Sequence, residues 1–363
     1  MAAAPLLALL VATAAPLDAP LGVGTPATLR QLFLDVTAAD ARAPGPLALD
    51  LRWALANEWS TPTTLVRGDR VVQLRTDEQV DTLQLAVTVP WAGLGASPLL
   101  ARVSTTVAGR LSAQWGGYTD GLVEWWHRLG HYTNFERQLF GRDAVHVLLR
   151  EQGGPTLVAL ERGRVAPGDV ALQNQVLLAA GGTSVRGAAS RWGVSARVDL
   201  KLPVGSLASL GGSGAPDAAL ALLGTAELTS WLTLHALAAG SAWGGLPDGF
   251  ALQPRRWHAT GELSLAAVAW GTGFILEDRV VSPVFEGGWK PAADAPYEVP
   301  STATFAALRW HNQISGGIRR GPVTFWFSED FTPGARTGSG GPSWFYDSNA
   351  PDIVFGLALR LPL

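Results

Sequence analysis

The residues best suited to metal chemistry are Glu124, His127 and His131. Their spacing of i, i+3 and i+7 would bring them to one face of an uninterrupted helix, and zinc accepts such ligands. Gly130 favours the end of a helix before His131. We therefore expect a capped helix whose histidine is hydrogen-bonded, and no metal site.

The Ser and His residues of the chain show no pattern that is typical of nucleophilic catalysis. A serine hydrolase needs a Ser beside a His and an orienting partner. The histidines lie on separate segments, and no G-x-S-x-G sequence occurs. Gly211-Gly212-Ser213-Gly214 has no following Lys-Ser/Thr, so it does not predict a phosphate loop. We expect no enzyme and no cofactor, and a membrane-embedded lipid hydrolase is the least favoured alternative.

Charged residues gather on one side of predicted strands. In residues 190–203, "SRWGVSARVDLKLP", every second residue from Trp192 is apolar and ionic residues lie between them. In a lipid-embedded barrel the ionic side must face the lumen, because a lipid-facing Arg costs about 2–4 kcal/mol at the bilayer midplane. Both signs occur on neighbouring positions, which favours local pairing over strong charge selectivity. The predicted lumen-facing residues are Arg191, Arg197, Asp199, Lys201, Arg256, His258, Glu262 and Arg360.

Composition narrows the class of protein. The 363 residues carry 27 Lys+Arg and 30 Asp+Glu, which argues against nucleic-acid binding. No cysteine is present, so disulfides and thiolate ligands are excluded. Residues 228–246 have no formal charge, but polar and Gly residues make them a poor spanning helix. A membrane protein of this composition is therefore expected to be a β-barrel.

The N-terminus predicts a secretory signal. An apolar run from Leu6 to Val11 is followed by Ala12-Thr13-Ala14, which fits an A-x-A cleavage site. We expect residues 1–14 to be a signal peptide and residues 15–46 to be an N-terminal periplasmic or plug segment. Residues 47–363 are expected to form the barrel.

Period-2 alternation from residue 47 onward predicts about 14 antiparallel strands, with 12 as the alternative. We place them at 47–59, 69–76, 81–91, 144–151, 156–162, 168–178, 191–203, 217–228, 231–242, 256–270, 273–282, 302–315, 320–330 and 352–363. Long loops at 204–216, 243–255, 283–301 and 331–351 alternate with tight links at 229–230, 271–272 and 316–319. Long loops at one end and tight turns at the other are typical of a transmembrane β-barrel.

One stretch departs from this pattern. Residues 120–129, "DGLVEWWHRL", predict a short amphipathic helix that Asp120 caps. Residues 92–143 are too long for an ordinary loop. We expect them to form a helical insert that plugs or covers the lumen, with Asp120, Glu124, His127, Arg137 and Arg142 as its candidate residues.

Three stretches carry a family resemblance. "TDGLVEWWHRLGHYTNFER", "LKLPVGSLASLGGSGAPD" and the C-terminal "FSEDFTPGARTGSGGPSWFYDSNAPDIVFGLALRLPL" resemble the outer-membrane proteins of domain of unknown function 3187. The second stretch is similar to a K-x-P-x-G…S-G-x-x-D segment that is shared with barrels for aromatic compounds. The family's usual final Phe is replaced by Leu363. The resemblance implies a barrel in the outer membrane of a Gram-negative bacterium, with no established activity.

The sequence thus predicts an all-β transmembrane barrel with one short helix in a long loop. The leading hypothesis is a passive channel or uptake protein for small solutes, and the shared K-x-P-x-G segment points to apolar or aromatic ones. The alternative is a structural or partner-binding barrel without transport. The expected partners are outer-membrane lipid, the barrel-assembly machinery and a small-molecule solute, with no nucleic acid.

Overall fold

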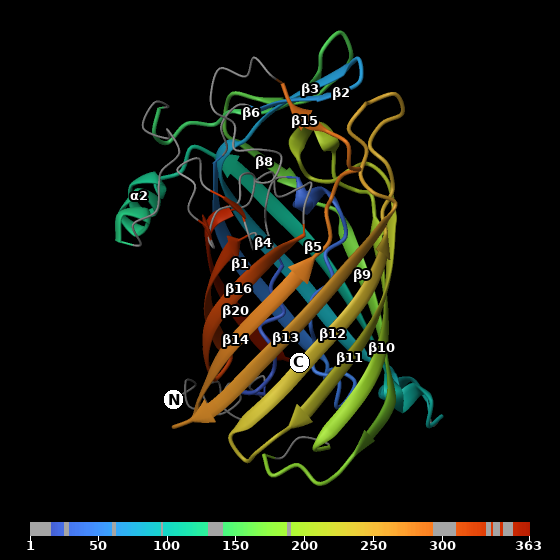
Figure 1. Cartoon of the computed structure of the whole chain (residues 1–363). Coiled ribbons are helices and arrows are strands. Elements are labelled where there is room, and N and C mark those ends of the chain that lie inside the picture. The colour runs from blue at the N-terminus through green and yellow to red at the C-terminus, as the bar shows by residue number, and fades with distance from the viewer. Residues whose placement is uncertain are drawn as a thin grey trace, which may run out of the picture.

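The computed structural model describes residues 16–24, 29–59, 63–95, 97–129, 141–186, 190–292, 310–331, 335–336, 342–343 and 351–363. Its main feature is a thirteen-stranded antiparallel sheet that closes on itself through the pairing of β4 with β5 (Figure 1). The predicted signal peptide, residues 1–14, lies outside the described residues.

Twelve strands form the closed wall, and β8 (Arg164–Pro167) is an additional strand that pairs with the end of β5. In wall order they are β4 (Asp77–Pro90), β1 (Ala48–Trp59), β20 (Pro351–Pro362), β17 (Val323–Phe331), β16 (His311–Arg320), β14 (Thr272–Val281), β13 (Trp257–Ala269), β12 (Leu232–Ala242), β11 (Asp217–Glu227), β10 (Trp192–Leu202), β9 (Val170–Gly181) and β5 (Val103–Trp115).

The strand number therefore corrects the leading prediction of 14 and agrees with the alternative of 12. Three predicted strands, 69–76, 144–151 and 156–162, fall in a separate five-stranded sheet of order β15-β2-β3-β6-β7. One wall strand, β5, lies inside the range 92–143 that was expected to be a helical insert. Only α2 (Asp120–Leu129) is α-helical among the described residues of that range.

The two ends of the barrel differ in their connections. Short turns join β11 to β12, β13 to β14, and β16 to β17, the last through Gly321-Pro322. The predicted link at 316–319 is instead part of β16. The C-terminus lies at the same end, where Leu363 N donates to Leu47 O at 3.0 Å. We call this the short-turn end and the opposite one the long-loop end.

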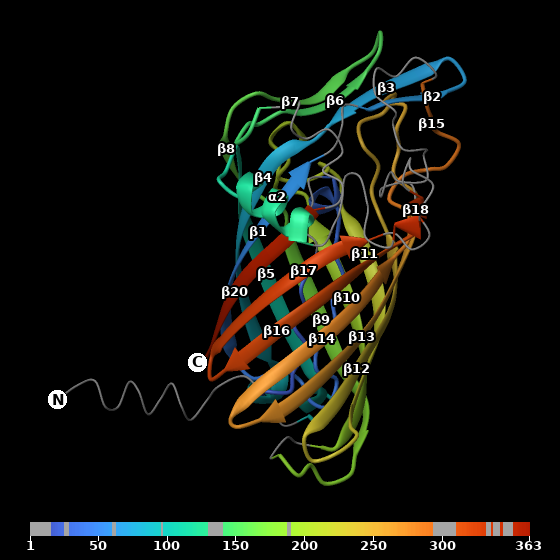
Figure 2. The same cartoon turned by 60° about the vertical axis from the view of Figure 1, so that its left-hand side comes forward.

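The small sheet lies at the long-loop end (Figure 2). Its strands are β2 (Thr63–Arg67), β3 (Arg70–Arg75), β6 (Val147–Glu151), β7 (Thr156–Leu160) and β15 (Lys290–Pro291). The remaining short elements are η1 (Arg30–Leu32), η2 (Trp91–Leu94), η3 (Leu100–Arg102), η5 (Leu207–Ser209), and the paired β18 (Ala335–Arg336) and β19 (Pro342–Ser343).

The wall has an apolar outer face. Leu220, Leu263 and Leu276 point outward and are more than half exposed, whereas their polar neighbours point inward and are buried. Apolar-out and polar-in alternation is the pattern of a transmembrane β-barrel. In the part of the chain that the structure describes, no helix has the length and apolar character to cross a bilayer.

Candidate functional site

Strand β10 shows how the sequence builds the lumen. Its inward residues Arg197, Asp199 and Lys201 are at most 3% exposed, while the outward Val198 and Leu200 are 44% and 38% exposed. Arg197 Nε donates to Asp199 Oδ1 at 2.8 Å, so the two charges on one face pair locally. The same alternation recurs on neighbouring strands and gives the lumen an ionic inner face.

The lumen is occupied by the N-terminal part of the chain. Residues 16–24 and 29–46, which we call the luminal segment, form two limbs: the first runs from the short-turn end toward the long-loop end, and the second runs back (Figures 1 and 2). The limbs lie against each other, since a side chain at Gly22 would collide with the main-chain oxygen of Ala38 and one at Gly24 with the Asp35 side chain. Of residues 15–46, expected to be a periplasmic or plug segment, the described residues 16–24 and 29–46 thus lie inside the barrel.

Wall carboxylates hold the main chain of the luminal segment. Glu277 accepts a hydrogen bond from Leu21 N at 3.0 Å. On the second limb, Glu262 accepts from Ala38 N at 3.1 Å. Because these N–H groups find no partner within a regular element, the carboxylates satisfy donors that would otherwise be buried alone. Asp217 does the same for Leu34 N at 2.8 Å.

Small residues let the segment approach one half of the wall. A side chain at Gly193 of β10 would collide with the main chain of Ala41 and Arg42. Ser195 Oγ donates to Ala41 O at 3.0 Å, and Ala41 N donates to Thr225 Oγ1 at 3.0 Å. The second limb therefore lies directly on β10 and β11.

An ion cluster ties the two limbs together near the short-turn end. Arg42, whose side chain is 2% exposed, forms ion pairs with Asp18 at 3.0 Å, Asp40 at 2.7 Å and Glu227 at 3.1 Å. Burial alone would raise the pKa of Asp18, but hydrogen bonding and charge from Arg42, with Thr233 and Arg186, hold that pKa below its usual value. Asp18 thus stays ionised at neutral pH.

A second cluster lies near the long-loop end and explains the K-x-P-x-G…S-G-x-x-D segment. Lys201 Nζ is 3.0 Å from both Asp169 Oδ2 and Asp217 Oδ2, and it donates to Ser213 Oγ at 2.8 Å. It also donates to Leu32 O at 2.6 Å. The segment therefore fastens its own loop and the luminal segment to the wall.

An apolar cluster closes over the luminal segment at the long-loop end. Leu29, Leu32 and Phe33 of that segment pack in one buried group with side chains of the small sheet and of three long loops. Phe33 stacks on Trp243 with ring centroids 4.5 Å apart. We call this group the cap. The members from the sheet and loops are Leu65, Val72, Leu74, Val145, Val147, Leu149, Val158, Leu160, Leu210, Leu246, Phe250, Ala251, Leu252, Val284, Phe285 and Trp289.

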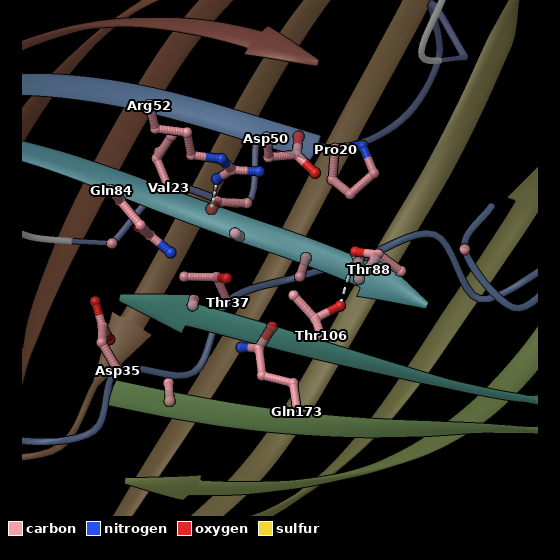
Figure 3. A pocket seen from close by; sticks show the side chains of 18 of the residues that line it. Pro20, Val23, Asp35, Thr37, Asp50, Arg52, Gln84, Thr88, Thr106 and Gln173 are labelled. Atoms are coloured by element: carbon pink, nitrogen blue, oxygen red, sulfur yellow. Dashed lines mark hydrogen bonds between the residues drawn. The ribbon is translucent and has the colours of Figure 1, made fainter. Parts of the chain in front are cut away.

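A cavity of about 430 Å³ remains between the luminal segment and the other half of the wall. It runs along β1, β4, β5 and β9, as Figure 3 shows. The labelled wall residues in that view are Asp50, Arg52, Gln84, Thr88, Thr106 and Gln173, and those of the luminal segment are Pro20, Val23, Asp35 and Thr37. The lumen is thus filled on the β10–β14 side and hollow on the opposite side.

The charged groups around the cavity already have partners. Arg52 donates to Gly22 O at 2.6 Å. Arg360 lies 3.8 Å from Asp50, and Arg279 donates to Asp35 at 3.1 Å. The side chains left to face the cavity are mostly hydroxyls, amides and small apolar groups.

Most of the predicted lumen-facing residues lie inside the barrel. Arg197, Asp199, Lys201, His258 and Glu262 are buried, and Arg360 lines the cavity.

Two predicted positions must be corrected. Arg191 and Arg256 are exposed residues that directly precede β10 and β13, not inner-wall residues. Arg191 Nε donates to Glu227 O at 3.2 Å. Alternation extrapolated past the end of a strand fails because the chain turns there.

The helix α2 does not plug the lumen. Trp126 packs edge-on against Phe327, 5.5 Å between centroids, and Phe327 follows the outward-facing Val323 and Phe325 on β17. The helix therefore lies outside the wall, as both cartoons show (Figures 1 and 2). The prediction of a helix that plugs or covers the lumen is corrected: α2 lies against the outer face of β17, and the lumen is occupied by the N-terminal segment.

The candidate residues of this insert anchor the helix to the barrel. Asp120 accepts hydrogen bonds from Asn57 Nδ2 at 2.9 Å and Asp143 N at 2.8 Å. Glu124 pairs with Arg142, whose Nε lies 3.1 Å from its carboxylate. Arg137 and the side chain of His127 lie outside the described residues.

Sequence reasoning missed the residues that line the cavity. Gln84, Ala86 and Thr88 alternate on β4, and Ser104, Thr106 and Ala108 do so on β5. The β4 residues lie on a predicted strand, but they carry no charge and were therefore not selected as lumen-facing candidates. The β5 residues lie in a range that was not predicted to be a strand. Among the described residues, no group of three or more His, Asp or Glu side chains is arranged to hold a metal ion.

Comparison with known proteins gives only distant similarities. No family model and no curated protein matches the chain. A COG4313 outer membrane channel from Pseudomonas putida F1 matches at 9% identity and a TM-score of 0.44, covering 88% of this chain and 97% of that one. A Pseudomonas aeruginosa FadL homologue matches at 9% identity and a TM-score of 0.38, covering 96% and 99%. A deletion mutant of the monoaromatic hydrocarbon channel TodX gives the same identity and TM-score, covering 96% of each chain. At this distance the matches assign neither family nor solute to the chain.

Proposed function

We propose that this protein is a passive channel of a bacterial outer membrane, through which small solutes pass along the β1-β4-β5-β9 side of the lumen. The observation that carries the proposal is the cavity of about 430 Å³ beside the luminal segment. The luminal segment also accepts hydrogen bonds from Arg52 and Gln175 on this side of the wall, and the space between these contacts is left open. The resemblance to domain of unknown function 3187 proteins is consistent with this location and is part of the proposal.

The orientation follows from the ends of the barrel. Short turns of outer-membrane barrels face the periplasm, and long loops face the outside. The cap then lies on the outer side and the Arg42 cluster on the periplasmic side. Solutes entering from outside must pass the cap, so we propose that its loops move during transport.

The alternative is a structural barrel without transport. The cap and the buried ion clusters favour it, because together they fill much of the lumen. The two functions differ in one measurable property, which is whether the purified protein conducts in a membrane.

The test is conductance in a planar bilayer with matched tryptophan substitutions. Ala108 lines the cavity, and its neighbour Val107 faces outward and is 44% exposed. Ala108→Trp should lower the conductance severalfold because an indole fills the path. Val107→Trp should leave it unchanged, since its side chain meets lipid. No current from the wild-type protein, or an equal loss in both variants, contradicts the proposed path.

A further inference from the structure

The wall of the cavity carries uncharged polar side chains along β4, β5 and β9. Gln84, Thr88, Thr106 and Gln173 point into it (Figure 3), and each can both donate and accept hydrogen bonds. Between them lie small residues that leave room, namely Ala86, Ala108 and Ala171. The result is a space bordered by hydroxyl and amide groups.

One hydroxyl of this wall has hydrogen-bonding capacity to spare. Thr82 Oγ1 on β4 lines the cavity and is buried, and it has no hydrogen-bond partner among the residues that the structure describes. Because this oxygen is itself buried, a ligand can bond to it only after the Thr82 side chain rotates toward the cavity. Thr88 and Thr106 bond to each other at 2.9 Å, and each hydroxyl keeps further lone pairs for a ligand.

Ions are poorly matched to this space. Arg360 is near Asp50, Asp35 is held by Arg279, and Arg52 donates to main-chain oxygens of the luminal segment. A permeating cation would lose water without gaining an unpaired carboxylate, which is costly away from bulk solvent. An anion would reach Arg52 or Arg110 only in competition with the main-chain oxygens that these two side chains already bond.

Apolar solutes are poorly matched for a different reason. They would remove water from the Gln and Thr side chains and return no hydrogen bond. The K-x-P-x-G segment, which suggested such solutes, uses its Lys201 to hold Asp169, Asp217 and Ser213. Its charge is thus taken up within the protein, and the motif gives no support for an aromatic solute.

We infer that the cavity binds and passes small uncharged solutes rich in hydroxyl or amide groups, of the class of polyols and monosaccharides. This inference rests on the proposed channel function and specifies its solute. The volume of about 430 Å³ lies within the range of pockets for small molecules, about 300–1,000 Å³. A polyol exchanges its bonds with water for bonds with the wall at little net cost.

The test is the swelling of vesicles that contain the purified protein. Vesicles in isosmotic xylitol should swell faster than protein-free ones. The double variant Thr106→Val/Gln173→Met keeps the side-chain size and removes the polar groups, so swelling should slow by about fivefold for each lost hydrogen bond. Thr260→Val is the matched control, because Thr260 is a buried residue of β13 that does not line the cavity. It should swell at the wild-type rate.

The outcomes separate the solute class from the channel itself. Potassium chloride current without xylitol swelling overturns the solute class and leaves the channel standing. Neither current nor swelling overturns both. Equal swelling of the wild type and the double variant also overturns the inference. Folding of each variant is checked by its heat-modifiable migration in gels. The single variant Thr106→Ser keeps the hydroxyl and should therefore swell at nearly the wild-type rate.

Discussion

At the scale of the residue, buried charges of the lumen act by fastening one chain segment to another. Lys201 is the clearest case, since its ammonium group contacts Asp169, Asp217, Ser213 and Leu32 O. Its side chain is 4% exposed. A charge in this position stabilises the folded protein only while its partners are present, because each ion has lost most of its water.

Lys201→Met should therefore destabilise the protein by about 3–5 kcal/mol, the usual cost of removing one partner of a buried pair. The measurement is urea unfolding in lipid vesicles, followed by tryptophan fluorescence. Lys290→Met makes the same change at an exposed residue of β15 and should cost less than about 0.5 kcal/mol. Similar losses in both variants would contradict a structural role for the Lys201 cluster.

Sequence patterns predict which of these residues face inward but not what they contact. Arg197 and Asp199 are two residues apart on one strand, so alternation alone brings them to one face, where they pair at 2.8 Å. The partner of Arg42 is Asp18, 24 residues away and on the opposite limb of a segment without regular structure. No periodicity marks such a contact, and only the closed barrel brings the two groups together.

At the scale of the element, each wall strand has one side for lipid and one for the lumen. Val198 and Leu202 are both outward residues of β10 and equally exposed at 44%. Val198 lies near the middle of the strand and Leu202 at its end. The membrane distinguishes the two positions by depth.

Val198→Arg should destabilise the folded barrel by about 2–4 kcal/mol, because it places a charge near the bilayer midplane. Leu202→Arg should cost only about 0–1 kcal/mol, since the charge reaches the interface. Urea unfolding in vesicles of fixed lipid composition measures both. If Leu202→Arg costs as much as Val198→Arg, the strand does not cross the membrane as proposed.

The prediction of strands succeeded where the alternation of apolar and polar residues was strong. It failed to separate strands of the barrel wall from strands of the small sheet, because both alternate in the same way. Strands of the small sheet such as β3 and β6 alternate just as wall strands do, so they were counted as wall strands. β5 was missed because its outward side includes Thr105 and Gly109 among the apolar residues. Its pairing with β4, which closes the barrel, depends on long-range contacts that a local pattern does not encode.

At the scale of the whole molecule, the luminal segment and the path lie side by side. The second limb rests on β10 and β11, and the cavity borders β1, β4, β5 and β9. Permeation beside the segment therefore does not require that limb to leave the barrel. A disulfide that fixes the second limb to the wall tests whether solutes pass while the limb stays in place.

The lock joins Ala41 of the luminal segment to Thr225 of β11. Ala41 N lies 3.0 Å from Thr225 Oγ1, so the two positions are close enough for a trial disulfide. The chain has no other cysteine to interfere. In the Ala41→Cys/Thr225→Cys variant, conductance should be the same in the oxidised and reduced protein, because the lock holds the limb where it already lies, with the cavity open beside it. The single variant Ala41→Cys, oxidised in parallel, controls for chemical damage. A current that is lost on oxidation and returns on reduction would instead show that solutes pass only when the segment leaves the wall.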